Sequence, residues 1–349
     1  MFFSSKKVLG LDIGSSSIKL AELTHTNTGA SIDNFAFIQS PQSALSNGEI
    51  TDPFLVAESI KSIFKEKSFK NKQACVGLSG TAVIVKKISM PEVDNKNILE
   101  QVRYEAAQYL PFDISQVTID YHRLSFKSGS AENMDLLIVA AQNEFILNYL
   151  QAVQQAGLKC AILDVNSLAL ANIFELNYGK TSEPVAVFNF GSTLTNFLVL
   201  FQGEVIFSRD IPVGGFHFTN EICKNMGVTF DEAESLKISQ SQSEGPEETR
   251  TFMNLAMEHV TEEIRNSIDF YAATANGLPI SKAFHTGGAS LTAGLVEHLS
   301  NALKIPFEPL NPFINIQSKN KELSSSYLKQ VAPFVSVVFG LALRKQGEK

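Results

Sequence analysis

The sequence predicts an α/β protein of two lobes, with a small α+β module inserted into the first lobe. Three observations lead to this prediction. Apolar strands that run into a glycine and several hydroxyl residues occur twice, at residues 8–20 and 185–196. A strand, helix, strand, strand, helix block lies between them, at residues 83–155. The 349 residues, of which 44% are hydrophobic, are enough to form two separate cores.

The first lobe is expected to comprise residues 1–81 and, after the insertion, residues 157–184. Phe54, Ile60 and Ile63 recur at helical spacing, which predicts an amphipathic helix over residues 53–65. A second helix is expected at residues 167–177. Apolar or alternating runs predict strands, at residues 7–13, 18–24, 31–38, 74–78 and 159–164.

The inserted module is expected to span residues 82–156. Pro111-Phe112-Asp113 follows its first helix. Phe112 either caps the end of that helix or lines a groove toward the first lobe, and the sequence leaves both open. The predicted strands are residues 83–88, 117–126 and 135–141, and the predicted helices are residues 96–109 and 144–155.

The second lobe is expected at residues 185–326, and residues 327–349 are expected to cross back to the first lobe. Polar segments predict loops at residues 239–246 and 318–326. The predicted strands are residues 185–190, 197–201 and 204–208. The predicted helices are residues 216–226, 230–238 and 247–275, and one that begins near Leu291.

The first glycine-bearing strand exit has the composition of a phosphate cradle. Gly14 allows the backbone to approach a phosphate closely. Asp12 at the strand end can hold a hydrated Mg²⁺, and Lys19 can reach the same anion as a point charge. Hydroxyl and amide donors follow the glycine, at Ser15, Ser16 and Ser17. Taken alone, the segment is equally typical of a hairpin turn rich in Gly and Ser.

Three further glycine-bearing strand exits occur downstream. The first repeats the order of the opening segment, with Asn189 at the strand end and Gly191 in the turn. Its hydroxyl residues are Ser192, Thr193 and Thr195. The other two exits are Val213-Gly214-Gly215 and Thr286-Gly287-Gly288-Ala289. Four glycine-bearing strand exits in this order are hard to assign to chance.

These four exits resemble those of the actin, Hsp70 and sugar-kinase superfamily, and the resemblance covers nearly the whole chain. It implies an actin-like, ribonuclease H-like fold in which the two lobes share one site for ATP or ADP with Mg²⁺. It also implies that a last helix, over residues 332–344, crosses back to the first lobe, and that the nucleoside lies against bare backbone at the paired glycines. Asp12 and Asn189 would hold the Mg²⁺ through water. Glu234 and Lys237 would grip the adenosine and Glu221 the ribose. By spacing alone, Glu234 and Lys237 are also an ordinary surface ion pair one helical turn apart.

Within the superfamily the chain is similar to the type IV pilus assembly protein PilM family, itself similar to the division protein FtsA. The similarity lies in Ile88-Ser89-Met90-Pro91, Pro111-Phe112-Asp113, Thr118-Ile119-Asp120-Tyr121 and Asn311-Pro312-Phe313. It implies that the inserted module is SHS2-like, of the FtsA 1C type. It also implies a cytoplasmic scaffold of the pilus machinery that serves twitching motility and is peripheral to the inner membrane.

The same resemblance implies a partner. This is the cytoplasmic N-terminal segment of the inner-membrane protein PilN, bound in a groove between the first lobe and the module, so that membrane association is indirect. The scaffold would link the alignment complex to the pilus motor. Motor ATPases and further copies of the chain are additional candidate partners. An extended segment in an apolar groove is a common mode of recognition.

Asn189 departs from the superfamily, which usually has aspartate at this position. An amide can orient a metal-bound water but cannot accept a proton as a base. Loss of a general base typically lowers a rate by about 10²- to 10⁴-fold. The sequence therefore predicts nucleotide binding with weak or absent hydrolysis, and it assigns no catalytic residue.

Charge and composition argue against several other classes. With 29 basic and 36 acidic residues the formal net charge is −7, which offers no basic field for nucleic acid or anionic lipid. No apolar run of about 18 residues occurs, so neither a membrane span nor export is expected. Cys75, Cys160 and Cys223 lack metal or redox spacing and are expected to be buried thiols.

Two alternative functions stay open at this stage. An FtsA-like division filament would carry an amphipathic membrane helix after its last packed helix, whereas polar residues follow here, at 344–349. A small-molecule kinase would need a carboxylate base beside an acceptor pocket, and no acid in either lobe has a setting that demands this role.

Overall fold

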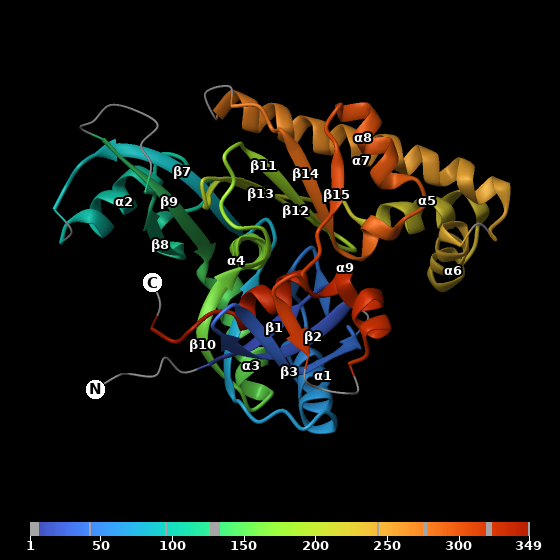
Figure 1. Cartoon of the computed structure of the whole chain (residues 1–349), viewed down its shortest axis with the longest axis horizontal. Helices are drawn as coiled ribbons and strands as arrows, with labels where there is room; N and C mark the ends of the chain where they lie inside the picture. The colour runs from blue at the N-terminus through green and yellow to red at the C-terminus, as the bar shows by residue number, and fades with distance from the viewer. Residues whose placement is uncertain are drawn as a thin grey trace.

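The computed structural model describes residues 7–41, 43–94, 96–125, 133–242, 244–274, 278–318 and 323–347. The strand end expected at residue 126, the helix end expected at residue 275, and parts of the polar segments 239–246 and 318–326 lie outside these residues. Figure 1 shows the first lobe at the bottom, the second lobe above it, and the inserted module at the upper left.

The sheet of the first lobe has the strand order β10-β6-β1-β2-β3-β16. β1 is fully buried between the parallel β6 and the antiparallel β2, as expected of a strand whose only charged residue is Asp12 near its end. The strands are β1 (Leu9–Ile13), β2 (Ser17–Thr26), β3 (Gly29–Gln39), β6 (Gln73–Leu78), β10 (Lys159–Val165) and β16 (Ile316–Ser318). A short hairpin, β4 (Leu45–Ser46) and β5 (Glu49–Ile50), was not predicted.

β16 corrects the sequence-based boundary between the lobes. It pairs in parallel with β3 of the first-lobe sheet, although the sequence placed residues 185–326 in the second lobe. A strand of three residues carries too little pattern to reveal its partner.

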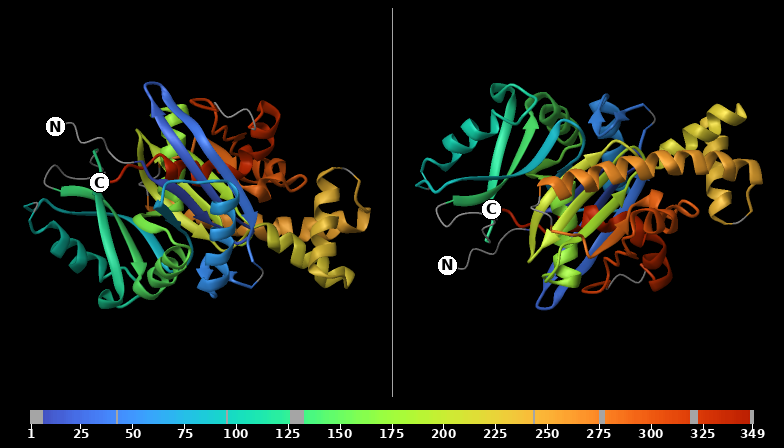
Figure 2. Two further views of the ribbon diagram at one scale, coloured as in Figure 1. Left: turned by 90° about the horizontal axis from the view of Figure 1, so that it is seen from below. Right: turned by 90° about the horizontal axis from the view of Figure 1, so that it is seen from above.

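Helices pack on both faces of this sheet (Figures 1 and 2). α1 (Pro53–Glu66) and α3 (Asn143–Gln155) share one core cluster with it, and α4 (Asn166–Tyr178) and α9 (Ser325–Ala342) share the other. α1 begins where the Asp52 carboxylate accepts hydrogen bonds from two backbone N–H groups, directly before Pro53 in the first turn. α3 was assigned to the module by sequence, but its buried face packs in the core of the first lobe.

α9 begins at Ser325 rather than at residue 332, because the Ser324 hydroxyl accepts the backbone N–H of Tyr327 and caps the helix. Pro333 therefore lies inside the helix and not in its first turn. Two glycines allow the helix to pack closely on its neighbours. A Cβ atom on Gly340 would lie 1.9 Å from the Ala169 carbonyl oxygen of α4, and one on Gly10 would lie 2.4 Å from the Val338 carbonyl oxygen.

The module contains β7 (Val83–Pro91), α2 (Ile98–Ala106), a short 3-10 helix (Ile114–Gln116), β8 (Val117–Arg123) and β9 (Asn133–Gln142), with the strand order β7-β9-β8. Asp113 caps the 3-10 helix by accepting the Ser115 N–H, while α2 has already ended at Ala106. Phe112 packs against the module's own core. Phe112 therefore neither caps α2 nor lines a groove.

The sheet of the second lobe has the order β13-β12-β11-β14-β15. Its strands are β11 (Val185–Phe190), β12 (Thr195–Phe201), β13 (Glu204–Ile211), β14 (Lys282–Thr286) and β15 (Phe307–Pro309). Its helices are α5 (Gly215–Met226), α6 (Phe230–Ser241), α7 (Glu247–Thr274) and α8 (Leu295–Leu303). The helix expected near Leu291 is instead a short 3-10 turn (Gly288–Leu291), and α8 begins after it.

The stacked rings of Phe188 and Phe197, with centroids 4.6 Å apart, lie in the core of the second lobe. Of the three free thiols only Cys75 is fully buried, and Cys160 and Cys223 are half-buried. Burial raises the pKa of the Cys75 and Cys160 thiols, so both are protonated at neutral pH.

An ion pair anchors the chain just after α9, at the second residue beyond the helix. Arg344 Nη1 lies 3.1 Å from Oδ2 of the buried Asp164 on β10. Burial raises the pKa of Asp164, and the charge of Arg344 opposes this increase. We expect Arg344→Met to lower the free energy of unfolding at pH 7 by about 3 kcal/mol, because a buried carboxylate loses its partner.

The same substitution has an expected pH dependence. A carboxyl whose pKa is raised in the folded state favours folding most below its unfolded pKa of about 4, and that contribution is lost as the pH rises through the folded value. The loss of free energy of unfolding that Arg344→Met causes should therefore be smaller at pH 5 than at pH 7. Urea unfolding at both pH values measures this loss, with Arg250→Met at an exposed position as the control. An equal loss at pH 5 and pH 7 would contradict the pairing of Arg344 with a buried carboxyl of raised pKa.

Candidate functional site

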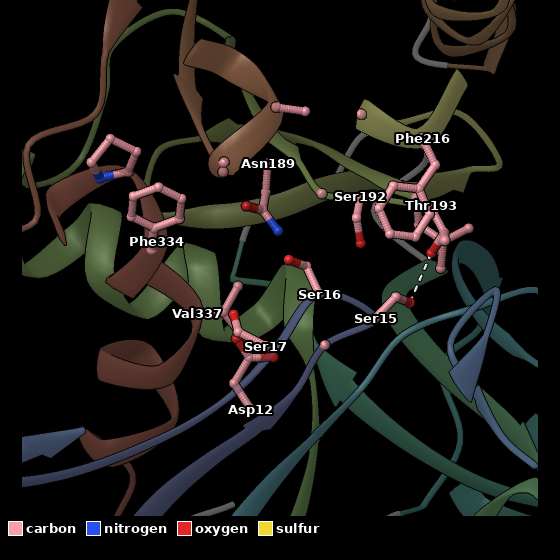
Figure 3. Close-up of a pocket in the computed structure, with 18 of the residues that line it drawn as sticks. Asp12, Ser15, Ser16, Ser17, Asn189, Ser192, Thr193, Phe216, Phe334 and Val337 are labelled. Carbon is pink, nitrogen blue, oxygen red and sulfur yellow. Dashed lines mark hydrogen bonds between the residues drawn. The ribbon is translucent and has the colours of Figure 1, made fainter. Parts of the chain in front are cut away.

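A cavity of about 510 Å³ lies between the two lobes (Figure 3). It brings together all but three of the site residues predicted from sequence. Those that line it are Asp12, Gly14, Ser15, Ser16, Ser17, Lys19, Asn189, Gly191, Ser192, Thr193, Gly215, Glu234, Lys237, Gly287, Gly288 and Ala289.

The first loop is the tight turn between β1 and β2. The Gly14 N–H donates to the Ser17 carbonyl oxygen at 3.2 Å. Ser40 holds the turn from behind, since its hydroxyl donates to the Gly14 carbonyl and its N–H donates to the Ser16 carbonyl. The hydroxyl groups of the turn are therefore left to line the cavity.

Asp12 and Lys19 are register partners on β1 and β2, and Lys19 Nζ lies 2.9 Å from Asp12 Oδ2. Lys19 is thus not the independent cation that the sequence suggested. The pair stands beneath the loop, and both side chains are largely buried. An anion in the loop would meet a lysine whose charge is already shared with a carboxylate.

The second loop joins β11 and β12, and the start of α5 closes over it. The Gly191 N–H donates to the Leu194 carbonyl, and the Gly215 N–H donates to the Gly191 carbonyl, both at 2.9 Å. Across the cleft, the Ser15 and Thr193 hydroxyl oxygens are 2.9 Å apart, which Figure 3 marks with a dashed line. The two loops therefore meet directly.

Three predicted residues do not line the cavity. The Thr195 hydroxyl is fully buried and donates to the Val213 carbonyl at 2.8 Å. Gly214 lies behind the second loop, where a Cβ atom would come within 2.5 Å of the Gly191 carbonyl oxygen. Glu221 accepts from Asn225 one turn along α5. The alternation of side chains along β12 turns Thr195 inward, which its position in the motif did not reveal.

Glu234 and Lys237 form an ion pair of 2.6 Å, and Lys237 is buried rather than a surface residue. Lys237 also donates to the Thr219 hydroxyl at 2.9 Å and to the Gly215 carbonyl at 3.2 Å. Burial lowers the pKa of Lys237, and Glu234 opposes this shift. The pair thus ties α6 to α5 beneath the cavity wall.

The end of the cavity near β14 is apolar. Gly287 has φ +90° and packs against Phe190, and the Phe334 ring of α9 lies over Gly288. Phe334 and Leu291 remain 40% and 51% exposed, as expected of side chains that line an open wall. Such a pocket suits a ligand with an anionic end and a flat apolar end.

Sequence reasoning missed several lining residues, including Ser79, Tyr149, Asn166, Asn196, Phe216, Ile238, Gln242, Leu291 and Phe334. Asn166 follows the end of β10, and a polar residue at a strand exit was a usable signal. Phe334 and Leu291 gave no such sequence signal, because apolar residues in a helical pattern are typical of any hydrophobic core.

The donors present suit a hydrated Mg²⁺ held through few protein groups. Asp12 supplies a buried carboxylate, of which only Oδ2 is engaged by Lys19. No group of three His, Cys, Asp or Glu side chains within the described ranges could hold a metal ion by itself. Mg²⁺ usually keeps several waters and binds through one or two carboxylates plus phosphates, which this donor set allows.

Two α/β lobes with hydroxyl-bearing turns that face each other across one cleft define the actin-like fold. The ethanolamine utilization protein EutJ from Carboxydothermus hydrogenoformans has the same fold, with TM-score 0.56, 16% identity, and coverage of 97% of this chain and 89% of that chain. The chain belongs to the family described as type IV pilus assembly protein PilM, whose family model matches residues 10–346.

Other similarities agree with this membership. A solved structure described as the PilM-PilN type IV pilus biogenesis complex is 27% identical, covers 97% of this chain and 98% of its own, and has TM-score 0.88. The cell division protein FtsA of Bacillus subtilis is 24% identical over 252 residues, which are 66% of this chain and 57% of that protein. The chain thus spans little more than half the length of that FtsA. Among the described residues, no helix has the length and hydrophobicity to span a bilayer.

Proposed function

We propose that this protein is a nucleotide-dependent scaffold of type IV pilus assembly. In this proposal Mg²⁺ with ATP or ADP binds in the cleft between the lobes, and the cytoplasmic N-terminal segment of PilN binds in a neighbouring groove. The observation that supports it most strongly is the meeting of the Ser15 and Thr193 loops over one cavity, in a chain of the PilM family.

The neighbouring groove has a volume of about 920 Å³ and lies between the module and both lobes. The sequence placed it between the first lobe and the module, and β13 and α7 of the second lobe add a further wall. Its apolar lining includes Val83, Val85, Tyr109, Ile206, Phe207, Phe270 and Leu278.

Two edge strands border this groove. β7 is at the edge of the module's sheet, and β13 is at the edge of the second lobe's sheet. Edge strands carry unpaired backbone donors and acceptors, to which an extended segment can add as a further strand. Lys86 lies over the Tyr109 ring and Arg209 over the Phe270 ring, so cations stand at the rim. These features fit an extended, mainly apolar segment.

We expect hydrolysis in the cleft to be slow or undetectable. Of the described lining residues, the only carboxylates are Asp12 and Glu234, and each is paired with a lysine. Asn189 offers an amide, which cannot accept a proton. A carboxylate paired with a lysine is a poor general base, so neither the kinase alternative nor rapid ATP turnover has support from these residues.

The proposal places the protein at the cytoplasmic face of the inner membrane, where PilN would hold it. From there it would link the membrane complex to the pilus motor. The net charge of −7 supports attachment through a protein partner rather than through anionic lipid.

Calorimetric titration with a synthetic PilN N-terminal peptide from the same genome, with and without Mg²⁺-ATP, tests the proposal. We expect saturable binding that Phe270→Ala weakens at least about tenfold, because exposed aromatic anchors dominate such interfaces. Leu255→Ala is the matched control, since Leu255 is equally exposed on α7 but lies outside the groove. Absence of peptide binding, or equal weakening by both variants, would count against the groove as the site.

A further inference from the structure

Three polar side chains stand side by side on the second-lobe sheet. Asn189 on β11 is the register partner of Asn196 on β12, and Asn196 is the register partner of Asp210 on β13. Asn189 Nδ2 lies 2.8 Å from Asn196 Oδ1, and Asn196 Nδ2 lies 2.7 Å from Asp210 Oδ1. We call these three residues the amide ladder. Asn189 and Asn196 line the cleft between the lobes, whereas Asp210 lines the groove.

The first lobe holds the far end of the amide ladder. The Ser79 hydroxyl and the Gly80 N–H, both just after β6, donate to Asp210 Oδ2 at 2.8 and 2.7 Å. The second N–H of Asn196 donates to the Ser79 oxygen at 2.8 Å. Every hydrogen-bonding group of Asn196 is thus used, and the amide ladder spans the boundary between the lobes.

The carboxylate of Asp210 fixes which partner donates in each of these hydrogen bonds. Burial raises the pKa of the Asp210 carboxyl, and the hydrogen bonds that it accepts from Asn196, Ser79 and Gly80 oppose this shift. Surrounded by these donors the carboxylate only accepts, so Asn196 turns its NH₂ group toward Asp210 and its oxygen toward Asn189. Asn189 must then donate its own NH₂ group to Asn196, which leaves its Oδ1 to the cleft. Figure 3 shows the Asn189 side chain extending toward Ser16 and Ser17, at the turn between β1 and β2.

A metal-bound water directs a lone pair at the metal and presents its two O–H groups, as donors, to the surrounding groups. We infer that Asp210 is a positioning residue that acts through Asn196 to present the Asn189 oxygen, rather than its NH₂ group, to a water of Mg²⁺. This inference rests on the proposed binding of Mg²⁺-nucleotide in the cleft. Because Ser79 and Gly80 belong to the first lobe, the orientation also depends on the present arrangement of the lobes.

The amide ladder accommodates a carboxylate at only one of its ends. With aspartate at position 189, a carboxylate oxygen would face Asn196 Oδ1, and the two acceptors would repel each other. If the Asn196 amide turned over to avoid this, its Oδ1 would instead face the carboxylate of Asp210. Replacing Asp210 by asparagine at the same time would reverse the two bonds that join the three side chains. The Ser79 hydroxyl would then turn to donate to the Asn196 oxygen, and the Gly80 N–H would still donate to the oxygen of residue 210. We therefore expect Asn189→Asp alone to reduce the gain in ATP affinity that Mg²⁺ provides. The double variant, Asn189→Asp with Asp210→Asn, is expected to recover this gain.

The experiment measures ATP affinity by calorimetry in Mg²⁺ and in EDTA, with thermal unfolding of every variant. We expect Asp210→Asn and Asn189→Asp each to reduce the Mg²⁺-dependent gain in affinity by about 10- to 100-fold, the usual cost of losing a group that orients a metal's surroundings. Affinity in EDTA should stay within about threefold. The double variant should regain most of the loss. Asp164→Asn, at a buried carboxylate outside both cavities, is the matched control.

Unchanged Mg²⁺ dependence in Asp210→Asn, or a double variant no better than either single one, would overturn the inference. A wild type that binds ATP without any gain from Mg²⁺ would overturn it while leaving nucleotide binding intact. A wild type that binds no ATP would overturn the proposed function and the inference together. If Asp210→Asn alone does not fold, the double variant is compared with Asn189→Asp. A double variant whose gain in ATP affinity from Mg²⁺ is no larger than that of Asn189→Asp would overturn the inference.

Discussion

Gly340→Val is expected to cost about 4 kcal/mol or more of folding free energy, which is exceptional for one substitution. The added Cβ would lie 1.9 Å from the Ala169 carbonyl oxygen and 2.5 Å from its carbonyl carbon. These are backbone atoms of α4, so the strain cannot be relieved by rotating a side chain. β1 also holds α9 closely, because a Cβ atom on Gly10 would lie 2.4 Å from the Val338 carbonyl oxygen. The helix cannot move away from one contact without entering the other.

Urea unfolding followed by circular dichroism measures this loss. Lys329→Val is the control, because Lys329 is exposed on the same helix and the change in helix propensity costs less than about 1 kcal/mol. A loss below about 1 kcal/mol for Gly340→Val would mean that α9 and α4 do not pack as described.

Asp12→Ala is expected to weaken Mg²⁺-ATP binding by about 100-fold, or about 2.8 kcal/mol. The substitution removes the carboxylate that can hold a metal-bound water. It also leaves Lys19, whose side chain is 11% exposed, without its partner. The freed lysine can pair with a phosphate, so affinity in EDTA should fall much less than affinity in Mg²⁺.

Calorimetry with ATP in Mg²⁺ and in EDTA separates the two effects. Asp33→Ala is the matched control, since Asp33 forms an exposed pair with Lys7 on the same sheet. Equal losses in Mg²⁺ and in EDTA would show that Asp12 acts on the fold of the loop rather than on the metal.

Local patterns predicted most of the fold. The apolar run that leads to Asp12, with the glycine and hydroxyls after it, identified the central strand and its turn. The long-range pairing of β16 with β3 was missed, because no local pattern in three residues specifies a strand so distant in sequence. The start of α9 was missed for another reason. Pro333 is typical of a first turn, and the cap at Ser324 outweighed that preference.

The candidate site was predicted at its glycine-bearing strand exits, including Gly287 and Gly288, whereas the apolar side chains of its wall were missed. Residues at glycine-bearing strand exits were identified because backbone geometry and composition coincide there. Phe334 was missed because its helical pattern is also that of core residues. Asp210 was missed because its significance depends on the register of three strands, which places it beside Asn196. Pairing across strands, rather than residue type, is what the sequence could not supply.

The pairing of β16 with β3 and the packing of α9 on β1 set an order for folding during synthesis. The second-lobe sheet is formed by residues 185–309, a continuous stretch. The first-lobe sheet and its cover need residues 316–342 as well, so β1 to β3 emerge from the ribosome long before their last partners. Contacts of such sequence separation form slowly, and an uncovered β3 edge is open to pairing with other chains meanwhile. The lobe whose synthesis begins first is therefore completed last. A chaperone would act in the interval between the synthesis of β1 to β3 and that of β16 and α9.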